Sequence, residues 1–341
     1  MSTYRGLGRT GVKVSRLCLG TMMFGAWGNT DHADCHKIIH AALDAGINFV
    51  DTADVYSAGE SEEIVGEALK GRRQDVILAT KFHGEMGPDR NMRGTSRRWI
   101  IAEVENSLRR LQTDWIDLYQ VHRLDLSTDL DETLGALTDL VRQGKVRYIG
   151  TSTFPAEWIV EAQWVSQERS RERFVCEQPP YSMLVRGAET AVLPTCLRHG
   201  VAVIPWSPLA GGWLTGKYRK GAEPPVGSRA ITGRIPSRFD LELPGNRRKQ
   251  EIVEELVPLA EAAGMTMVHM ALAWVLKHPA VTSAIIGPRT MAQLESQLGG
   301  DEVPLEEGLL DRIDELIPPG TTLNPPDSGF TPPSLSASQR R

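Results

Sequence analysis

Short apolar segments alternate with amphipathic segments along almost the whole chain, and this alternation limits the folds that the chain can adopt. The apolar segments number eight, from "LCLGT" (residues 17–21) to "SAIIG" (283–287). Between them, apolar residues recur at helical spacing, as in "SRRWIIAEVENSLRRL" (96–111). Strands that are apolar throughout are typical of parallel sheets covered on both faces. Eight such units predict an α/β protein with a (β/α)8 TIM barrel, and an open doubly wound sheet is the alternative.

The six residues "GLGRTG" (6–11) match the G-x-G-x-x-G pattern of dinucleotide-binding loops. That pattern has its physical meaning only between a strand and a helix, because the pyrophosphate lies at the helix N-terminus. Here only five residues precede it, and "VKVSRLCLG" (12–20) favours extended chain. We therefore expect a turn between two short strands, forming an N-terminal β-hairpin added to the barrel, and no dinucleotide at this turn.

Capping residues and changes in composition predict where helices and domains end. In "SEEIVGEALKG" (61–71), Ser61 is the expected N-cap and Gly71 follows the last helical residue. Residues 215–250, rich in proline, glycine and arginine, predict a long loop after strand 7, at the barrel face where such loops act as lids. A helix is expected from about Glu251 to Ala263. We expect one barrel domain over residues 1–317 and an extended or disordered tail over 318–341.

Composition excludes several classes of protein. No apolar run approaches the roughly 20 residues of a membrane span, and the N-terminus lacks the apolar segment of a signal peptide, so we expect a cytoplasmic protein. The net charge of −5, without a basic stripe, argues against a nucleic-acid partner. The four cysteines are widely spaced and indicate reduced, buried thiols. His32, His36 and His40 have a spacing that can grip a metal, but no acidic partner completes a site, so we predict no metal.

Polar residues stand at the ends of three consecutive predicted strands. Asp51 lies near the end of "INFVDT", Lys81 ends "DVILATK", and His122 ends "IDLYQVH"; Tyr56 follows five residues after Asp51. Singly, each has an ordinary structural explanation, such as capping a turn or packing in the core. In a barrel, however, the carboxyl ends of parallel strands meet at one mouth. We therefore expect these four side chains to be neighbours in one site.

The chain resembles a known family in six motifs. "DTADVYSAGESEE", "LATK", "DLYQVH", "YIGTS", "IPWSPLAGG" and "IIGPRT" occur in the order and spacing of the aldo-keto reductase superfamily, up to about residue 316. The resemblance is to the branch that contains bacterial aldo/keto reductases and the potassium-channel β subunits. It implies a catalytic tetrad of Asp51, Tyr56, Lys81 and His122, and binding of NADP(H) without a Rossmann domain. A dinucleotide is therefore expected, but away from "GLGRTG".

The same resemblance implies which residues bind the cofactor. Ser152 and Gln178 would hold the nicotinamide carboxamide, and Thr153 replaces the asparagine that usually follows this serine. Arg289 would meet the adenosine 2′-phosphate, which favours NADP over NAD. Gln297 stands where asparagine is usual. The full implied set is Gly20, Thr21 and Met22 at the ribose, Asp51, Ser152 and Gln178, Trp206 stacked on the nicotinamide ring, Ser207, Leu209, Gly211 and Lys217 at the pyrophosphate, and Arg289, Gln293 and Gln297.

The chemistry of carbonyl reduction explains why the tetrad has these residue types. Hydride delivery to a carbonyl carbon leaves negative charge on oxygen, and a proton must reach that oxygen. A tyrosine hydroxyl, with a pKa of about 10, is too weak an acid unless a cation stabilises its phenolate. Lys81 can supply that cation to Tyr56, Asp51 would keep Lys81 in place, and His122 would orient the carbonyl.

These observations predict NADPH-dependent reduction of a small-molecule aldehyde or ketone to the alcohol. The alternative is an NADPH-binding redox-sensing partner protein of the channel β-subunit kind; a metal-dependent barrel hydrolase would need strand-end histidine pairs that the sequence lacks. The residues expected to line the substrate pocket are Phe24, Trp27, Tyr56, Phe82, His83, Met86, His122 and Arg123. Neither the physiological carbonyl compound nor the oligomeric state can be read from the sequence.

Overall fold

The chain forms two compact units, described here for residues 4–233 and 235–332 of a computed structural model. Unit 1 contains the residues up to Pro179 together with Val192–Pro205 and Pro279–Leu298. Unit 2 contains Pro180–Ala191, Trp206–His278 and the residues from Gly299 onward. The single domain expected over residues 1–317 stays a prediction.

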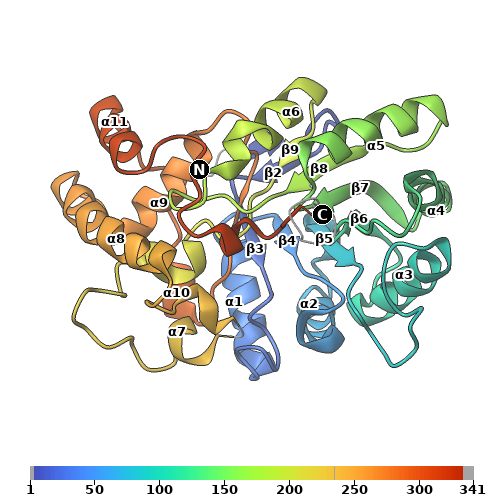
Figure 1. Ribbon diagram of the computed structural model, residues 1–341. Coiled ribbons are helices and arrows are strands. Elements are labelled where there is room, and N and C mark those ends of the chain that lie inside the picture. The colour runs from blue at the N-terminus through green and yellow to red at the C-terminus, as the bar shows by residue number, and fades with distance from the viewer. Residues whose placement is uncertain (1–3, 234, 333–341) are drawn as a thin grey trace. The chain divides into compact units, whose positions relative to one another are not determined.

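A parallel sheet of eight strands forms the centre of unit 1, with helices α1 to α5 around its outside (Figure 1). Its hydrogen-bonded order is β10-β3-β4-β5-β6-β7-β8-β9. The two outermost strands also meet, because the Thr282 N–H donates to the Val203 carbonyl at 2.7 Å. The predicted (β/α)8 fold is thereby confirmed. The strands are β3 (Leu17–Gly20), β4 (Phe49–Asp51), β5 (Ile77–Phe82), β6 (Ile116–Val121), β7 (Val146–Ser152), β8 (Phe174–Gln178), β9 (Ala202–Val203) and β10 (Ala284–Ile286).

The helices of unit 1 lie in the stretches between strands where helices are predicted, although α2 begins one residue before its predicted segment. Side chains of Asp31, Ser96 and Asp129 accept the first free N–H groups of α1, α3 and α4, as N-caps do. Apolar residues on one side of these helices are buried, which explains their helical spacing. The helices are α1 (His32–Asp44), α2 (Glu60–Ala68), α3 (Arg97–Leu111), α4 (Leu130–Arg142), α5 (Ala156–Glu168), α6 (Val192–His199) and α10 (Met291–Glu295).

The predicted cap of α2 is wrong. The helix begins at Glu60 and its N-cap is Gly59, whose φ of 100° lies in the left-handed region that glycine adopts readily. Ser61 lies inside the helix and is fully buried, and its hydroxyl contacts those of Thr21 at 2.9 Å and Thr52 at 3.1 Å. The hydroxyl that the local sequence assigns to capping is therefore used in tertiary contacts with the residues that follow β3 and β4.

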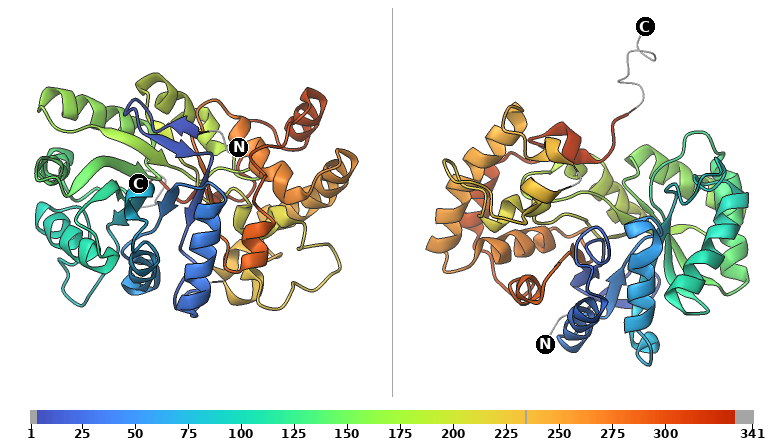
Figure 2. Two further views of the ribbon diagram at one scale, coloured as in Figure 1. Left: turned by 180° about the vertical axis from the view of Figure 1, so that it is seen from behind. Right: turned by 90° about the horizontal axis from the view of Figure 1, so that it is seen from below.

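The segment "GLGRTG" forms the turn of an N-terminal hairpin, as predicted. Strands β1 (Tyr4–Gly6) and β2 (Lys13–Ser15) pair antiparallel, and the left view of Figure 2 shows this hairpin in dark blue. Gly8 has a φ of 57°, and a Cβ there would lie 2.8 Å from the Gly200 carbonyl and 2.9 Å from that of Val175. This glycine therefore permits a close approach to the start of β8 and β9, not to a phosphate.

Unit 2 is mainly helical, with α7 (Arg229–Thr232), α8 (Pro244–Ala262), α9 (Met267–Lys277) and α11 (Glu307–Leu316). The start predicted for α8, about Glu251, is wrong. The polar run "GNRRKQ" is helical because Asn246, fully buried, donates to the carbonyls of Ser237 and Asp240 at 2.8 Å each. Within the described residues, no single helix is long and apolar enough to cross a membrane; α8 and α9 together pass by length and composition, but with a bend of 93°.

Part of the expected tail packs against other segments of unit 2. Residues Pro325–Ser328 form the 3-10 helix η6, and the Asp327 carboxylate pairs with the buried ammonium of Lys249 and with Arg238 at 3.3 Å. The Asn324 side chain donates to that of Asn246 at 3.1 Å. Residues 324–328 therefore differ from the extended or disordered segment expected there, because long-range polar contacts order them, and the rest of the expected tail stays a prediction. Residues 333–341, and residue 234 of the expected lid, lie outside the described residues.

Candidate active site

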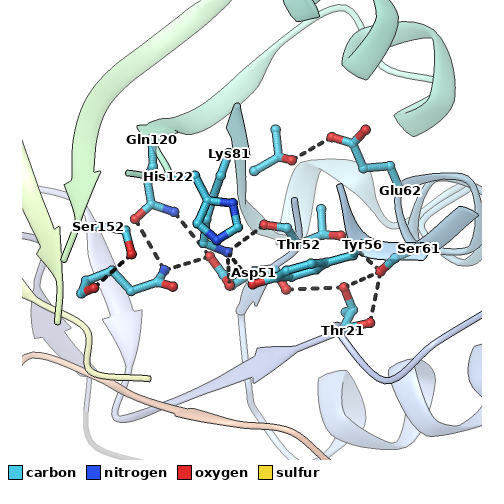
Figure 3. Close-up of polar contacts among 12 residues, drawn as sticks. Thr21, Asp51, Thr52, Tyr56, Ser61, Glu62, Lys81, Gln120, His122 and Ser152 are labelled. Atoms are coloured by element: carbon cyan, nitrogen blue, oxygen red, sulfur yellow. Dashed lines mark hydrogen bonds and ion pairs between the residues drawn. The ribbon is translucent and has the colours of Figure 1, made fainter. Parts of the chain in front are cut away.

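Polar side chains of unit 1 gather where strands β4 to β8 end (Figure 3). The four residues predicted to be neighbours are among them: Asp51 ends β4, Lys81 lies near the end of β5, and His122 follows β6. Tyr56 begins the 3-10 helix η1 (Tyr56–Gly59) on the loop after β4. The parallel sheet brings them together because its strands all end at one face.

Lys81 lies at the centre of this group and is fully buried. Its Nζ donates to the Asp51 carboxylate at 2.7 Å, to the Thr52 carbonyl at 2.8 Å and to the Tyr56 hydroxyl at 3.2 Å. These contacts use all three protons of the ammonium group. The side chain is therefore held in one position, with its charge against the tyrosine oxygen.

The buried Asp51 carboxylate accepts hydrogen bonds from three side chains of the site. One oxygen accepts from Lys81, and the other accepts from the amides of Gln120 at 3.1 Å and Gln178 at 2.9 Å. The Gln178 amide also donates to the side-chain oxygen of Gln120 at 3.3 Å. Asp51 is only 2% exposed, so these donors replace the water that it loses on burial.

Tyr56 is half-buried and lies between two other rings. Its ring centroid is 5.8 Å from that of His122, edge to face, and 5.9 Å from that of Trp27. The turn that follows it is unusual, because Ser57 and Ala58 have φ values of 50° and 56°. Non-glycine residues adopt such values rarely, and usually where tertiary contacts impose them.

The Asp51 carboxylate keeps Lys81 charged, whereas burial is the main cause that keeps the Tyr56 phenol and the His122 imidazole neutral. Burial lowers the pKa of Lys81, but the negative charge of Asp51 and the hydrogen bonds outweigh it, so this pKa lies above its ordinary value. Burial raises the pKa of the Tyr56 hydroxyl, and Lys81 opposes that rise only in part. Burial and the positive charges of Lys81 and Arg123 hold the pKa of His122 well below its ordinary value. At neutral pH the site thus presents a neutral phenol and a neutral imidazole beside a cation.

The cofactor-binding residues predicted in unit 1 lie in two groups. Gly20, Thr21, Ser152 and Gln178 are at strand ends beside Asp51, and the hydroxyl of Thr21 is turned inward to Ser61 and the Asp51 carbonyl. The second group surrounds α10: the Gln293 side chain accepts the Arg289 N–H at 2.8 Å, and the Gln297 amide donates to the Gln293 carbonyl at 2.7 Å. Met22 is half-buried just after β3.

The remaining predicted cofactor residues belong to unit 2. Trp206, Ser207 and Gly211 line a small pocket together with Arg238, Lys249 and Asp327. The Ser207 hydroxyl accepts the Gly211 N–H at 3.0 Å and so closes a tight turn. The Lys217 Nζ lies 5.2 Å from the centroid of the Tyr218 ring, and Leu209 immediately precedes the 3-10 helix η4 (Ala210–Thr215).

The residues predicted to line the substrate pocket divide into exposed and buried ones. Trp27 is beside Tyr56, and His83, Met86 and Arg123 are partly exposed. Phe24 and Phe82 are fully buried, and Phe82 packs on Tyr119 with ring centroids 4.7 Å apart. These two phenylalanines therefore pack beneath the surface and do not line an open pocket.

Two features outside the predicted site also have structural explanations. His32 and His36 contact Glu60 and Glu67 of α2, at 3.0 and 3.5 Å, and His40 bonds to the Ala68 carbonyl, so all three join α1 to α2. Among residues 4–233 and 235–332, no group of three or more His, Cys, Asp or Glu is placed to hold a metal ion. The four cysteines are free and buried, as predicted.

Sequence reasoning missed Gln120 and the carbonyl of Thr52. A signal for Gln120 exists, because it is a polar residue in an apolar strand and precedes His122 by two positions, which places both on one face. No side-chain pattern could reveal Thr52, since its backbone oxygen makes the contact with Lys81.

Comparison with known proteins agrees with this geometry. Residues 16–318 match the model of the "Aldo/keto reductase family", whose members generally use nicotinamide cofactors. The chain is 43% identical over 327 residues to "Uncharacterized oxidoreductase YrpG" of Bacillus subtilis (strain 168), covering 92% of this chain and 96% of that protein. With the same coverage of both chains, it is 36% and 35% identical over 332 residues to proteins of Arabidopsis thaliana and Oryza sativa subsp. japonica, each named "Probable voltage-gated potassium channel subunit beta". The chain therefore belongs to the aldo/keto reductase family and, at that level, is an oxidoreductase.

Proposed function

We propose that this protein reduces the carbonyl group of a small aldehyde or ketone to an alcohol, with NADPH as the hydride donor. The observation that supports this best is the contact of the Lys81 ammonium with both the Asp51 carboxylate and the Tyr56 hydroxyl, at 2.7 and 3.2 Å. A buried cation beside a phenol favours proton release, because it stabilises the phenolate that remains. Tyr56 is thus the general acid of the proposed reaction.

Each residue of the tetrad then has a separate task. A bound nicotinamide supplies the hydride to the carbonyl carbon. As negative charge develops on the carbonyl oxygen, Tyr56 transfers its proton there, and Lys81 stabilises the resulting phenolate. Asp51 holds Lys81 in place. His122, kept neutral by burial and by Lys81, donates an N–H to the carbonyl oxygen without competing for its proton.

Two observations in unit 1 fit a nicotinamide nucleotide. The Ser152 hydroxyl oxygen and the Gln178 side-chain oxygen stand at the ends of adjacent strands, paired in register, and can accept the N–H groups of a carboxamide. Gln297 is 5% exposed, and its side-chain oxygen is buried with no hydrogen-bond partner in the described part of the chain. Such an acceptor fits an amino group of a bound nucleotide, because an unpaired buried oxygen is costly.

The preference for NADPH over NADH rests on Arg289. A guanidinium forms paired, charge-assisted hydrogen bonds with a phosphate, and the resemblance assigns this residue to the adenosine 2′-phosphate. Gly20, Thr21 and Met22 would border the ribose, and Gln293 would lie beside the adenosine. The resemblance assigns Trp206, Ser207, Leu209, Gly211 and Lys217 of unit 2 to the nicotinamide ring and the pyrophosphate.

The test follows NADPH absorbance with 4-nitrobenzaldehyde for the wild type and for Tyr56→Phe. We expect turnover by the wild type and a loss of about 10²- to 10⁴-fold in the variant, equivalent to about 3–5 kcal/mol in the barrier. Binding of NADPH, followed by fluorescence titration, should be unchanged because the aromatic ring remains and only the hydroxyl is removed. Equal turnover by both proteins would exclude Tyr56 as the acid.

The second candidate function is an NADPH-binding protein that acts by binding another protein; the names of the two plant relatives, as channel subunits, favour the part of it that concerns a protein partner. The same experiment separates the two. Tight NADPH binding without turnover, over a panel of aliphatic, aromatic and sugar aldehydes, would support the second candidate. Turnover that depends on Tyr56 would support the reductase.

A further inference from the structure

We infer that Glu177 is a positioning residue, which holds the strained turn after β7 in the form that presents Ser152 to the nicotinamide carboxamide. This inference rests on the proposed function and adds to it a residue that does not touch the cofactor. It starts from the conformation of Thr153, which immediately follows β7.

Thr153 has a φ of 60°. That value lies in the left-handed region, which asparagine tolerates and a β-branched side chain strongly disfavours. A threonine at this position therefore needs contacts that impose the conformation. The turn is also buried, since Ser152 is 0% and Thr153 is 5% exposed.

The carboxylate of Glu177 supplies such contacts. One oxygen accepts the Thr151 hydroxyl at 2.5 Å, and the other accepts the Phe154 N–H at 3.1 Å, so the carboxylate holds the residues on both sides of Ser152 and Thr153. Thr151 and Glu177 are register partners on β7 and β8. Gln178, the next residue of β8, also fixes the turn. Its backbone carbonyl accepts the Thr153 N–H at 3.1 Å and the Ser152 hydroxyl at 3.0 Å.

Glu177 makes these contacts from the opposite side of the strand to Gln178. Successive side chains of a strand point to opposite faces, and Gln178 reaches inward to Asp51. Glu177 is fully buried, and none of the ion pairs found among the described residues includes it. Burial raises the pKa of its carboxyl group to about 7, although the hydrogen bonds oppose this rise. A buried carboxylate without an ion partner is costly, so its place here is explained by the turn that it holds.

The turn has a direct consequence for the candidate site. In this conformation the hydroxyls of Ser152 and Thr153 lie 3.4 Å apart, and the Arg123 guanidinium donates to both, at 3.4 and 3.3 Å. If the turn relaxes, the Ser152 hydroxyl moves away from its place beside Gln178 at the strand ends. Loss of Glu177 should then weaken contacts with the nicotinamide half of the cofactor and leave the adenosine half unaffected.

The test compares two ligands, NADP⁺ and adenosine 2′,5′-bisphosphate, which lacks the nicotinamide. Dissociation constants are measured by calorimetry for the wild type, Glu177→Ala, the milder Glu177→Gln, and the control Glu157→Gln, which changes an exposed carboxylate on α5. We expect Glu177→Ala to weaken NADP⁺ binding about tenfold, as for the loss of one positioned hydrogen bond. Glu177→Gln should show a smaller effect, the control none, and the bisphosphate should bind all four proteins equally.

A second substitution tests the role of strain. Glycine adopts a φ of 60° without cost, so Thr153→Gly should restore most of the NADP⁺ affinity of Glu177→Ala or, if that variant does not fold, of Glu177→Gln. Equal weakening of both ligands, or no rescue by Thr153→Gly, would overturn the inference. If the wild type binds the bisphosphate but not NADP⁺, or neither ligand, the proposed function fails, and this inference fails with it. NADP⁺ binding that is unchanged in the Glu177 variants would overturn the inference alone.

Discussion

Replacing Lys81 by methionine keeps much of the shape of the side chain and removes the ammonium group from the centre of the candidate site. In the wild type this group pairs with Asp51 at 2.7 Å, where the lysine side chain is 0% and the aspartate side chain 3% exposed. The substitution leaves the Asp51 carboxylate buried, with the amides of Gln120 and Gln178 as its remaining donors. It also leaves the Thr52 carbonyl without its partner.

The expected loss of stability follows from the Asp51 carboxylate and the Thr52 carbonyl, which lose their partner in this variant. Removing one member of a buried ion pair costs about 3–5 kcal/mol, chiefly because the other charge stays buried. Since two amide donors still face Asp51, we expect the lower end, about 3 kcal/mol. The double variant Asp51→Asn/Lys81→Met has no buried charge left over and should recover about 2 kcal/mol of this loss.

The assay is urea unfolding followed by tryptophan fluorescence and circular dichroism, for the wild type, Lys81→Met and the double variant. Turnover is measured in parallel and should fall about 10²- to 10⁴-fold in both variants, because Tyr56 loses its cation in each. Stability and activity should therefore separate: the double variant recovers stability but not turnover. A buried charge without its partner would not be the cause of the loss if Lys81→Met is as stable as the wild type. The same holds if the double variant is no more stable than Lys81→Met.

Three further changes test other parts of the reasoning. Gly8→Ala should lower the free energy of unfolding by about 2–4 kcal/mol, since it combines a left-handed φ with contacts of 2.8 and 2.9 Å to carbonyl oxygens. Gly11 has a φ of 84°, but apart from its chain neighbours no atom of the described residues lies within 4 Å of an added Cβ, so Gly11→Ala should cost only about 1–2 kcal/mol in the same denaturation assay. Arg289→Ala should raise the Kd for NADPH about 10- to 100-fold and leave that for NADH unchanged in fluorescence titrations, and an equal effect on both would exclude the 2′-phosphate contact. The pKa of Glu177 is raised from 4.5 to about 7 in the folded protein, so between these pH values the folded state binds more protons than the unfolded state. The stability that the protonated carboxyl group contributes is therefore lost as the pH rises. Relative to Glu177→Gln, the wild type should therefore lose about 3 kcal/mol of unfolding free energy as the pH rises through this window, and a pH-independent difference would contradict the shift.

Much of the fold could be predicted because it depends on local patterns. The apolar strands and the helical periodicity record which residues are buried, and burial is what selects strand or helix in each segment. The hairpin around "GLGRTG" could also be predicted, since the residues beside it favour extended chain. Boundaries were less accurate where tertiary contacts replace local ones, as at Ser61, which bonds to Thr21 and Thr52 instead of capping α2.

Part of the candidate site could likewise be predicted from local patterns, and part could not. Asp51, Lys81 and His122 could be placed together from the sequence, because a parallel barrel brings all its strand ends to one face. The hydrogen bonds that organise them could not, because they join residues far apart in the chain: Gln178 donates to Asp51 across 127 positions. Gln120 stands out as a polar residue in an apolar strand, but its bond to Asp51, 69 positions away, could not be predicted.

The sequence by itself determined the order of strands and helices, the position of the hairpin and the residue types at the strand ends. These properties depend on the spacing of apolar and polar residues within a few positions of one another. Only the tertiary structure decided that Lys81 contacts Tyr56, that α8 begins at Pro244, and that Thr153 takes a left-handed conformation beside Glu177. Such features depend on which distant groups meet in space, and a buried donor or acceptor takes whichever partner the packed fold provides.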